Sequence, residues 1–116
     1  MLTNIDALTG QELMRLWGVE SWSDPGAEYA IWNGCCVFAV VDQGGFIDLH
    51  MAMRRSERIR CRDAVSDLLE VIGDREIRAP ILSSNKSVCN LARNMGFYYE
   101  FSPDISSIFM RRPANG

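Results

Sequence analysis

Two polar residues, Asp48 and His50, lie two positions apart in a segment that could position a general base. Residues 46–53 alternate apolar and other side chains with a period of two, which indicates a β-strand on which Asp48 and His50 share one face. A carboxylate or an imidazole on an ordered strand is a usual proton acceptor in catalysis. The alternative is that His50, the one histidine of the chain, is a hydrogen-bonded structural residue of the sheet.

A run of arginines follows this strand directly. Five arginines fall within nine residues, and eleven of the twelve basic residues of the chain are arginine. Guanidinium groups bind phosphate or carboxylate in a bidentate way, so the run could hold an anion or an acidic protein surface, or it could be a solvated loop and helix start. Nucleic acid is an unfavoured partner, because the chain is acidic overall and no aromatic residue interrupts the run. The arginines are Arg54, Arg55, Arg58, Arg60 and Arg62.

Composition limits the class of protein. A chain of 116 residues that is 47% hydrophobic and 23% charged has room for one globular domain, which we expect to span residues 1–116. No apolar run approaches the roughly 18 residues that cross a membrane, and the N-terminus lacks the pattern of a secretory signal, so we expect a cytoplasmic protein. The four cysteines show no C-x-x-C spacing, and the chain has a single histidine, so we expect reduced thiols and no metal.

The candidate residues are set among alternating strand and helix patterns. Two predicted strands, 29–32 and 35–41, are joined around Asn33-Gly34, a type I′ hairpin pattern. After the strand 46–53 come a helix over about 60–72 that ends at Gly73, and a strand over 77–82 in which Pro80 marks a bulge or an unpaired edge. The remaining predicted elements are an N-terminal helix over 9–17, started by a capping box of Thr9 and Glu12, a helix between Asn85 and Gly96, and strands over 98–101 and 106–111.

One stretch of this pattern is similar to a known family. A capping Asn85, a short helix and Gly96-Phe97 at the start of a strand resemble the last conserved block of the GNAT superfamily of acyl-CoA N-acyltransferases. The order of strands and helices from Tyr29 to Arg112 resembles that family as well. The resemblance implies an α/β (α+β) fold with a mixed, mainly antiparallel sheet of about six strands flanked by helices.

The catalytic pattern of that family is incomplete. Its members hold the coenzyme A pyrophosphate on a loop of the form Arg/Gln-x-x-Gly-x-Gly/Ala, and the corresponding positions here are Arg60, Asp63 and Val65. Shifting the frame to Arg58 places Cys61 and Asp63 at the glycine positions. Many members also carry a helical tyrosine that protonates the leaving thiolate, and the residue at that position is Ala92.

These departures lead to a non-enzymatic interpretation. The chain resembles small GNAT-like proteins without the glycine loop that occur among head-assembly and internal virion proteins of short-tailed bacteriophages. That resemblance implies a bacteriophage protein of virion structure or head assembly, without a cofactor. It would lie in the host bacterial cytoplasm or the virion and bind phage structural or assembly proteins or a second copy of itself.

The alternative is a divergent acetyl-CoA-dependent N-acetyltransferase. In that case His50 or Asp48 serves as the general base, and Arg58, Arg60 and Asn85 contact the coenzyme.

Overall fold

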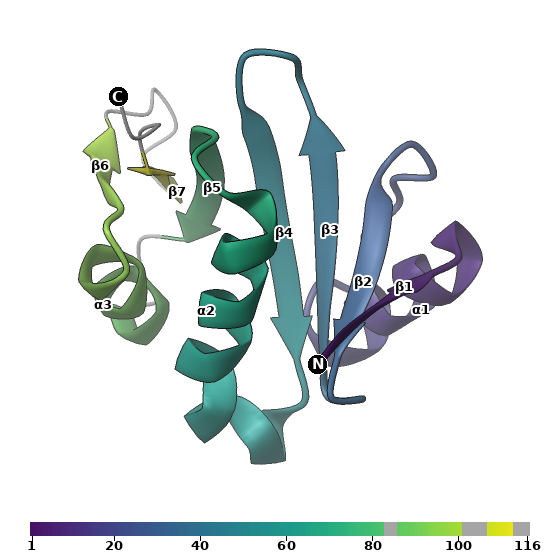
Figure 1. Cartoon of the computed structure of the whole chain (residues 1–116). Coiled ribbons are helices and arrows are strands. Elements are labelled where there is room, and N and C mark those ends of the chain that lie inside the picture. Colours follow the sequence, from purple (N-terminus) through teal and green to yellow (C-terminus); the bar gives the residue numbers. More distant parts are fainter. Residues whose placement is uncertain (83–85, 101–106, 113–116) are drawn as a thin grey trace.

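The computed structural model describes residues 1–82, 86–100 and 107–112, which form one seven-stranded sheet with helices on both faces (Figure 1). The strand order is β1-β2-β3-β4-β5-β7-β6, and every neighbouring pair is antiparallel except β4 and β5, which are parallel. The strands are β1 Leu2–Ile5, β2 Glu28–Trp32, β3 Cys36–Asp42, β4 Ile47–Met53, β5 Ile77–Leu82, β6 Tyr98–Glu100 and β7 Ser107–Arg112. The helices are α1 Ala7–Trp17, a 3-10 helix η1 Arg55–Arg60, α2 Cys61–Ile72 and α3 Lys86–Asn94.

This architecture confirms the predicted fold class, a mixed and mainly antiparallel sheet flanked by helices. The prediction of about six strands missed β1, which pairs with β2 from Leu2 opposite Trp32 to Ile5 opposite Tyr29. Four residues of mixed polarity are too short to show a strand period, so only the pairing partner reveals β1.

The start of α1 differs from the predicted capping box. Asp6 is the N-cap, and its carboxylate accepts hydrogen bonds from the backbone N–H of Thr9 (3.1 Å) and from the Thr9 hydroxyl (2.7 Å). The helix therefore begins at Ala7 rather than Thr9, and the prediction that Thr9 and Glu12 cap each other is wrong. Asp is as good a cap as Thr, and here it stands three residues earlier.

Two predicted glycine positions are confirmed by the backbone. Asn33 and Gly34 both have positive φ, 49° and 70°, as a type I′ turn between β2 and β3 requires. Gly96, after α3, has φ 94°, a conformation that favours glycine and ends the helix before Phe97.

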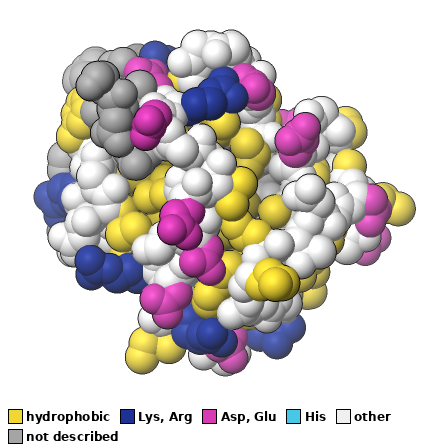
Figure 2. Space-filling view, in the orientation of Figure 1, with side chains coloured by type: hydrophobic (Ala, Val, Ile, Leu, Met, Phe, Trp, Pro, Cys, Tyr) yellow, Lys and Arg dark blue, Asp and Glu magenta, His cyan; other side chains and the backbone are white. Residues whose placement is uncertain are grey.

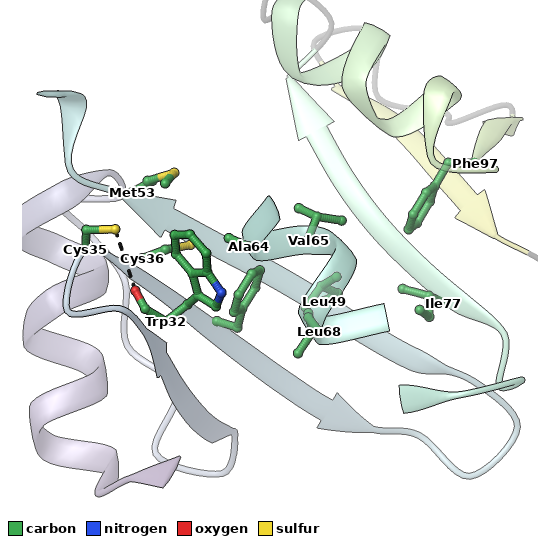
Figure 3. Close-up of a cluster of buried hydrophobic side chains, with 11 residues drawn as sticks. Trp32, Cys35, Cys36, Leu49, Met53, Ala64, Val65, Leu68, Ile77 and Phe97 are labelled. Carbon is green, nitrogen blue, oxygen red and sulfur yellow. Dashed lines mark hydrogen bonds between the residues drawn. The ribbon is translucent and has the colours of Figure 1, made fainter. Parts of the chain in front are cut away.

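The sheet separates two hydrophobic cores because alternate residues of β3 face opposite sides. Phe38 faces α2 and packs in the larger cluster with Trp32, Leu49 and Leu68. Figure 3 shows these three partners between the sheet and α2. Val37 and Ala39 point toward α1 and pack against Met14. The central strands β3 and β4 are thus covered on both faces.

Strand β5 pairs with β4 over two residue pairs only, Ile47 with Ile77 and Asp48 with Arg78, whereas its pairing with β7 runs the whole length of the strand. Beyond Asp48 the parallel ladder stops, and β4 and β5 separate (Figure 1). The sheet is therefore open between its two parallel strands.

Pro80 stands where the ladder has stopped. The amide of Ile47 donates to the carbonyl of Glu76 (2.9 Å), and backbone groups alternate along a strand, so residues 76, 78 and 80 all face β4. Proline has no N–H to donate at that third position. The prediction was a bulge or an unpaired edge. Strand β5 is not an edge strand, because Pro80 pairs with Phe109 of β7, but on its β4 side Pro80 is unpaired.

Within residues 1–82, 86–100 and 107–112, no helix has the length and hydropathy needed to cross a bilayer. The expectations of a cytoplasmic location and of a single domain stay predictions.

Candidate functional site

A cleft of about 700 Å³ lies where β4 and β5 separate. Its walls come from β4, from Ala79 and Pro80 of β5, from the end of α1, from the junction of η1 and α2, and from α3. Because β4 contributes residues of both faces, from Leu49 to Met53, the cleft reaches both sides of the sheet. We call it the central cleft, with an α1 end and an α2 end.

The α2 end of the central cleft is basic. Arg58 and Arg62 line it beside Cys61, the first residue of α2. Burial raises the pKa of the Cys61 thiol, and Arg58 opposes that shift, so the thiol stays protonated at neutral pH. In Figure 2, basic side chains gather at the end of the molecule where η1 and the start of α2 lie in Figure 1. Two guanidinium groups at a helix start form a favourable place for phosphate.

Asp63, which the sequence placed near the expected phosphates, is exposed on the first turn of α2 and is not part of the cleft lining. Cys61 and Val65 stand at positions where the GNAT loop carries glycine or alanine, and both residues line the cleft. A phosphate group would therefore meet arginine side chains before it met the helix backbone.

The α1 end of the central cleft is apolar. Four residues from the last turn of α1 and the two positions after it line this end beside His50 and Ala52. We call these four residues the α1 wall. Gly18 lets this wall lie directly on β4, since a Cβ at Gly18 would come 3.1 Å from the Cβ of Ala52. The α1 wall consists of Met14, Trp17, Gly18 and Val19.

His50 reaches the central cleft as a half-buried, neutral imidazole. Burial lowers its pKa below the ordinary value of 6.5, and the nearby carboxylates of Asp48 and Asp24 oppose that shift. The ring of Trp22 packs against the imidazole at 4.8 Å between centroids, tilted by 56°. A neutral imidazole held against an aromatic ring is able to accept a proton at neutral pH.

A hydrogen-bonded segment holds Trp22 in place over β4. Its indole N–H donates to the Tyr29 hydroxyl (2.8 Å), and that hydroxyl donates to the carbonyl of Asp24 (2.6 Å). Arg15 of α1 donates to the carbonyl of Trp22 (2.8 Å). The chain between α1 and β2 is thereby fixed against the face that carries His50.

Asp48 is on the same face of β4 as His50 but outside the cleft lining, where it accepts a hydrogen bond from the Gln43 amide (3.1 Å). The structure thus brings one of the two predicted base candidates to the cleft. The catalytic roles of both stay predictions.

Of the three predicted coenzyme residues, the structure brings one to the cleft. Arg58 lines the cleft, whereas the guanidinium of Arg60 lies 4.9 Å from the centre of the Trp32 ring, and Asn85 is outside the described residues. Ala92, at the position where the GNAT family carries tyrosine, lines the cleft with a methyl group. Contacts of Arg58, Arg60 and Asn85 with a coenzyme stay predictions.

Sequence reasoning missed the α1 wall and also Ile59 of η1, which lines the cleft and is 93% exposed. Gly18 at the end of a helical pattern was the one available sign of a close approach, but the residue it approaches is 34 positions away.

No protein-family model matches the sequence, and no curated protein matches it either. Solved structures do match the fold. A GNAT-family acetyltransferase of Streptococcus agalactiae is 16% identical with a TM-score of 0.62, covering 78% of this chain and 66% of its own. A chimera of the spermidine N-acetyltransferase SpeG of Vibrio cholerae with hSSAT is 9% identical with a TM-score of 0.71, covering 96% of this chain and 94% of its own. Naa50 of Arabidopsis thaliana, in complex with the bisubstrate analogue CoA-Ac-MVNAL, is 10% identical with a TM-score of 0.71, covering 96% of each chain.

The chain therefore has the GNAT fold, as its sequence pattern implied. The expectation of a non-enzymatic bacteriophage protein of virion structure or head assembly is wrong, because the structures that share this fold are acetyltransferases. These structures favour the alternative interpretation, and no finding supports a place in a virion. Self-association stays an untested prediction.

Proposed function

We propose that this protein is an N-acyltransferase that uses acetyl-CoA. The observation that carries the proposal is the central cleft between the separated strands β4 and β5, which joins a basic end at α2 to a neutral imidazole on the opposite face of the sheet. A cleft of this kind suits an anionic coenzyme that enters from one side and an amine that enters from the other.

The residues present fit the coenzyme. Arg58 and Arg62 would hold phosphate groups at the α2 end, and the apolar stretch between Leu49 and Ala79 suits an uncharged arm that runs between the strands. The glycines that the GNAT family uses are absent, so arginine forks would take over from backbone N–H groups. Acetyl-CoA supplies an acyl group activated as a thioester.

His50 would act on the amine. An ammonium must lose a proton before its nitrogen can attack a carbonyl carbon, and the low pKa of His50 keeps the imidazole in the accepting form at neutral pH. Trp22 covers one side of the ring and restricts its orientation. Asp48, two residues away on the same face, stabilises the imidazolium that forms when the proton arrives.

No tyrosine marks the acid position, because Ala92 lines the cleft there. Arg58 and Arg62 would be engaged by the phosphates, at the far end of the coenzyme's arm from the sulfur, so the thiolate that leaves would take its proton from water.

The test is acyl transfer to a mixed panel of amines. The protein is incubated with acetyl-CoA and each amine, free thiol is measured by a colorimetric reagent, and the acetylated amine is identified by mass spectrometry. We expect thiol release that depends on both the amine and the protein. Thiol release at the background rate with every amine, together with no binding of acetyl-CoA, would contradict the proposal.

A further inference from the structure

The α1 end of the central cleft has a composition that selects among amines. The side chains of the α1 wall, Met14, Trp17 and Val19, are all apolar, and His50 lies beside them in the lining. Met14 is fully buried, so Trp17 and Val19 are the side chains that an acceptor could contact. Resting on the acyl transfer proposed above, we infer that the acceptor is a primary amine on an apolar body with no second positive charge, of which an arylalkylamine is the simplest case.

Charge within the cleft argues against polycations. In the described lining, the charged side chains are Arg58 and Arg62, and no carboxylate takes part. A third guanidinium, that of Arg54, lies 5.5 Å from the centre of the Trp17 ring on the α1 wall. A spermidine or a lysine-rich peptide would bring several positive charges toward these arginines without an acidic partner along the cleft.

A single ammonium meets a different environment. Asp24 and Asp48 lie outside the lining and both raise the pKa of His50, so the negative charge near the described lining is concentrated at the imidazole and does not extend along the cleft. Asp24 is held by the N–H of Gly26 (3.1 Å) and Asp48 by the amide of Gln43 (3.1 Å). The compensation is thus fixed at one point beside the proposed base.

An apolar side chain of the α1 wall is exposed at the edge of the cleft. Val19 is 43% exposed and contributes to the lining. An aromatic or branched aliphatic group of the acceptor would cover it and stack near the half-buried ring of Trp17. A polar acceptor would leave the same surface uncovered.

The α1 wall is held in position before any acceptor arrives. The carbonyl of Met14 accepts hydrogen bonds from the N–H groups of both Gly18 (3.2 Å) and Val19 (2.8 Å). Gly18 in turn lies against Ala52 of β4, two residues from His50. The apolar surface and the imidazole therefore keep a fixed spacing, which favours one acceptor shape.

The experiment compares kcat/KM for 2-phenylethylamine, spermidine and a lysine-containing peptide at saturating acetyl-CoA. We expect 2-phenylethylamine to exceed both others by at least tenfold. Equal or better use of spermidine or the peptide would overturn the inference while leaving acyl transfer intact. Binding of acetyl-CoA without turnover of any of the three amines would also overturn the inference. Failure to bind acetyl-CoA, measured separately by calorimetry, would instead remove the proposed function on which the inference rests.

Two matched variants test the α1 wall directly. Val19→Asp places a carboxylate on the wall, and we expect the ratio of kcat/KM for 2-phenylethylamine to that for spermidine to fall at least tenfold. Val71→Asp makes the same change at an exposed position of α2 outside the cleft lining and should leave the ratio as in the parent protein. An unchanged ratio in folded Val19→Asp protein, verified by its circular dichroism spectrum, would overturn the assignment of this wall to the acceptor.

Discussion

The two ends of the central cleft differ in chemical character, one basic and the other apolar. The α2 end presents Arg58 and Arg62 at the start of a helix, whereas the α1 end presents Trp17 and Val19, backed by Met14, beside a neutral imidazole. Strand β4 separates the two environments, because its successive side chains alternate between the faces of the sheet. Under the proposed function, an anion would enter at the α2 end and an uncharged or singly charged apolar amine at the α1 end.

The two ends also depend on different kinds of interaction. Charge at the α2 end comes from exposed side chains of a 3-10 helix and a helix start, which tolerate substitution. The α1 end depends on close packing, since Met14 is fully buried and Gly10 and Gly18 allow α1 to approach the sheet. Substitutions should therefore change binding at one end and folding at the other.

The largest expected effect is at His50. His50→Gln keeps a polar side chain of similar size but removes the proton acceptor, and we expect kcat to fall by about 10²- to 10⁴-fold. Steady-state kinetics with 2-phenylethylamine measures the change, and acetyl-CoA affinity should stay within a few-fold of the parent value because the arginines of the α2 end are untouched. A variant with parental kcat would show that another group takes the proton.

Gly10→Ala should be the most damaging substitution for folding near the α1 end. A Cβ at Gly10 would come 2.2 Å from Cγ of Tyr29, so the added methyl forces α1 away from β2. Overpacking of this kind costs about 1–3 kcal/mol or more in the free energy of unfolding. That cost opposes the gain of about 1 kcal/mol that alanine offers over glycine in a helix.

Urea unfolding measures the balance, with Gly45→Ala as the control. Gly45 has no heavy atom within 4 Å of its added Cβ and no positive φ, so its replacement should change the free energy of unfolding by less than about 0.5 kcal/mol. A Gly10→Ala protein as stable as the control would mean that α1 is free to move off the sheet, contrary to the packing described.

A smaller effect is expected from pH. Because His50 must be neutral to accept a proton, kcat/KM should fall only when the pH drops through its lowered pKa, below 6.5. Stability should follow the same direction. The folded-state pKa lies below the unfolded value, so the unfolded chain binds more protons and the folded protein loses stability as the pH falls below about 6.5.

The Asp48→Asn variant tests whether the acidic limb of the pH profile reports the titration of His50. Loss of the Asp48 charge removes an interaction that raises the pKa of His50, so the acidic limb of the pH profile should move further toward low pH. A pH–rate profile of the variant tests the direction of the shift. Movement toward high pH would mean that the limb does not report His50.

Local sequence patterns were sufficient to predict most of the fold. The period of two in 46–53, the Asn33-Gly34 turn and the Gly96-Phe97 junction each follow from steric rules that act over a few residues. Strand β1 escaped because four residues carry no measurable period, and the helix cap was misplaced because Asp6 and Thr9 both have side chains that cap helices.

The candidate site was only partly predictable, because its composition depends on tertiary contacts. Asp48 and His50 are equivalent in sequence pattern, and the separation of β4 from β5 beyond Asp48 decides that His50 reaches the cleft. The absent glycines led to the wrong functional expectation, since a loop pattern describes one way to hold phosphate. The proposed function relies instead on the neighbouring Arg58 and Arg62, a way of holding phosphate that the pattern does not include.

The measurement that tests the central claim most directly is thermal unfolding of the protein with and without acetyl-CoA. Ligand at about 100 times its dissociation constant adds about 2.7 kcal/mol to the free energy of unfolding, which should raise Tm by roughly 10 °C for a chain of this size. Replacement of both Arg58 and Arg62 by Glu should abolish most of that increase, while Arg55→Glu, outside the cleft lining, should retain it. An unchanged Tm for the parent protein at millimolar acetyl-CoA would contradict the account.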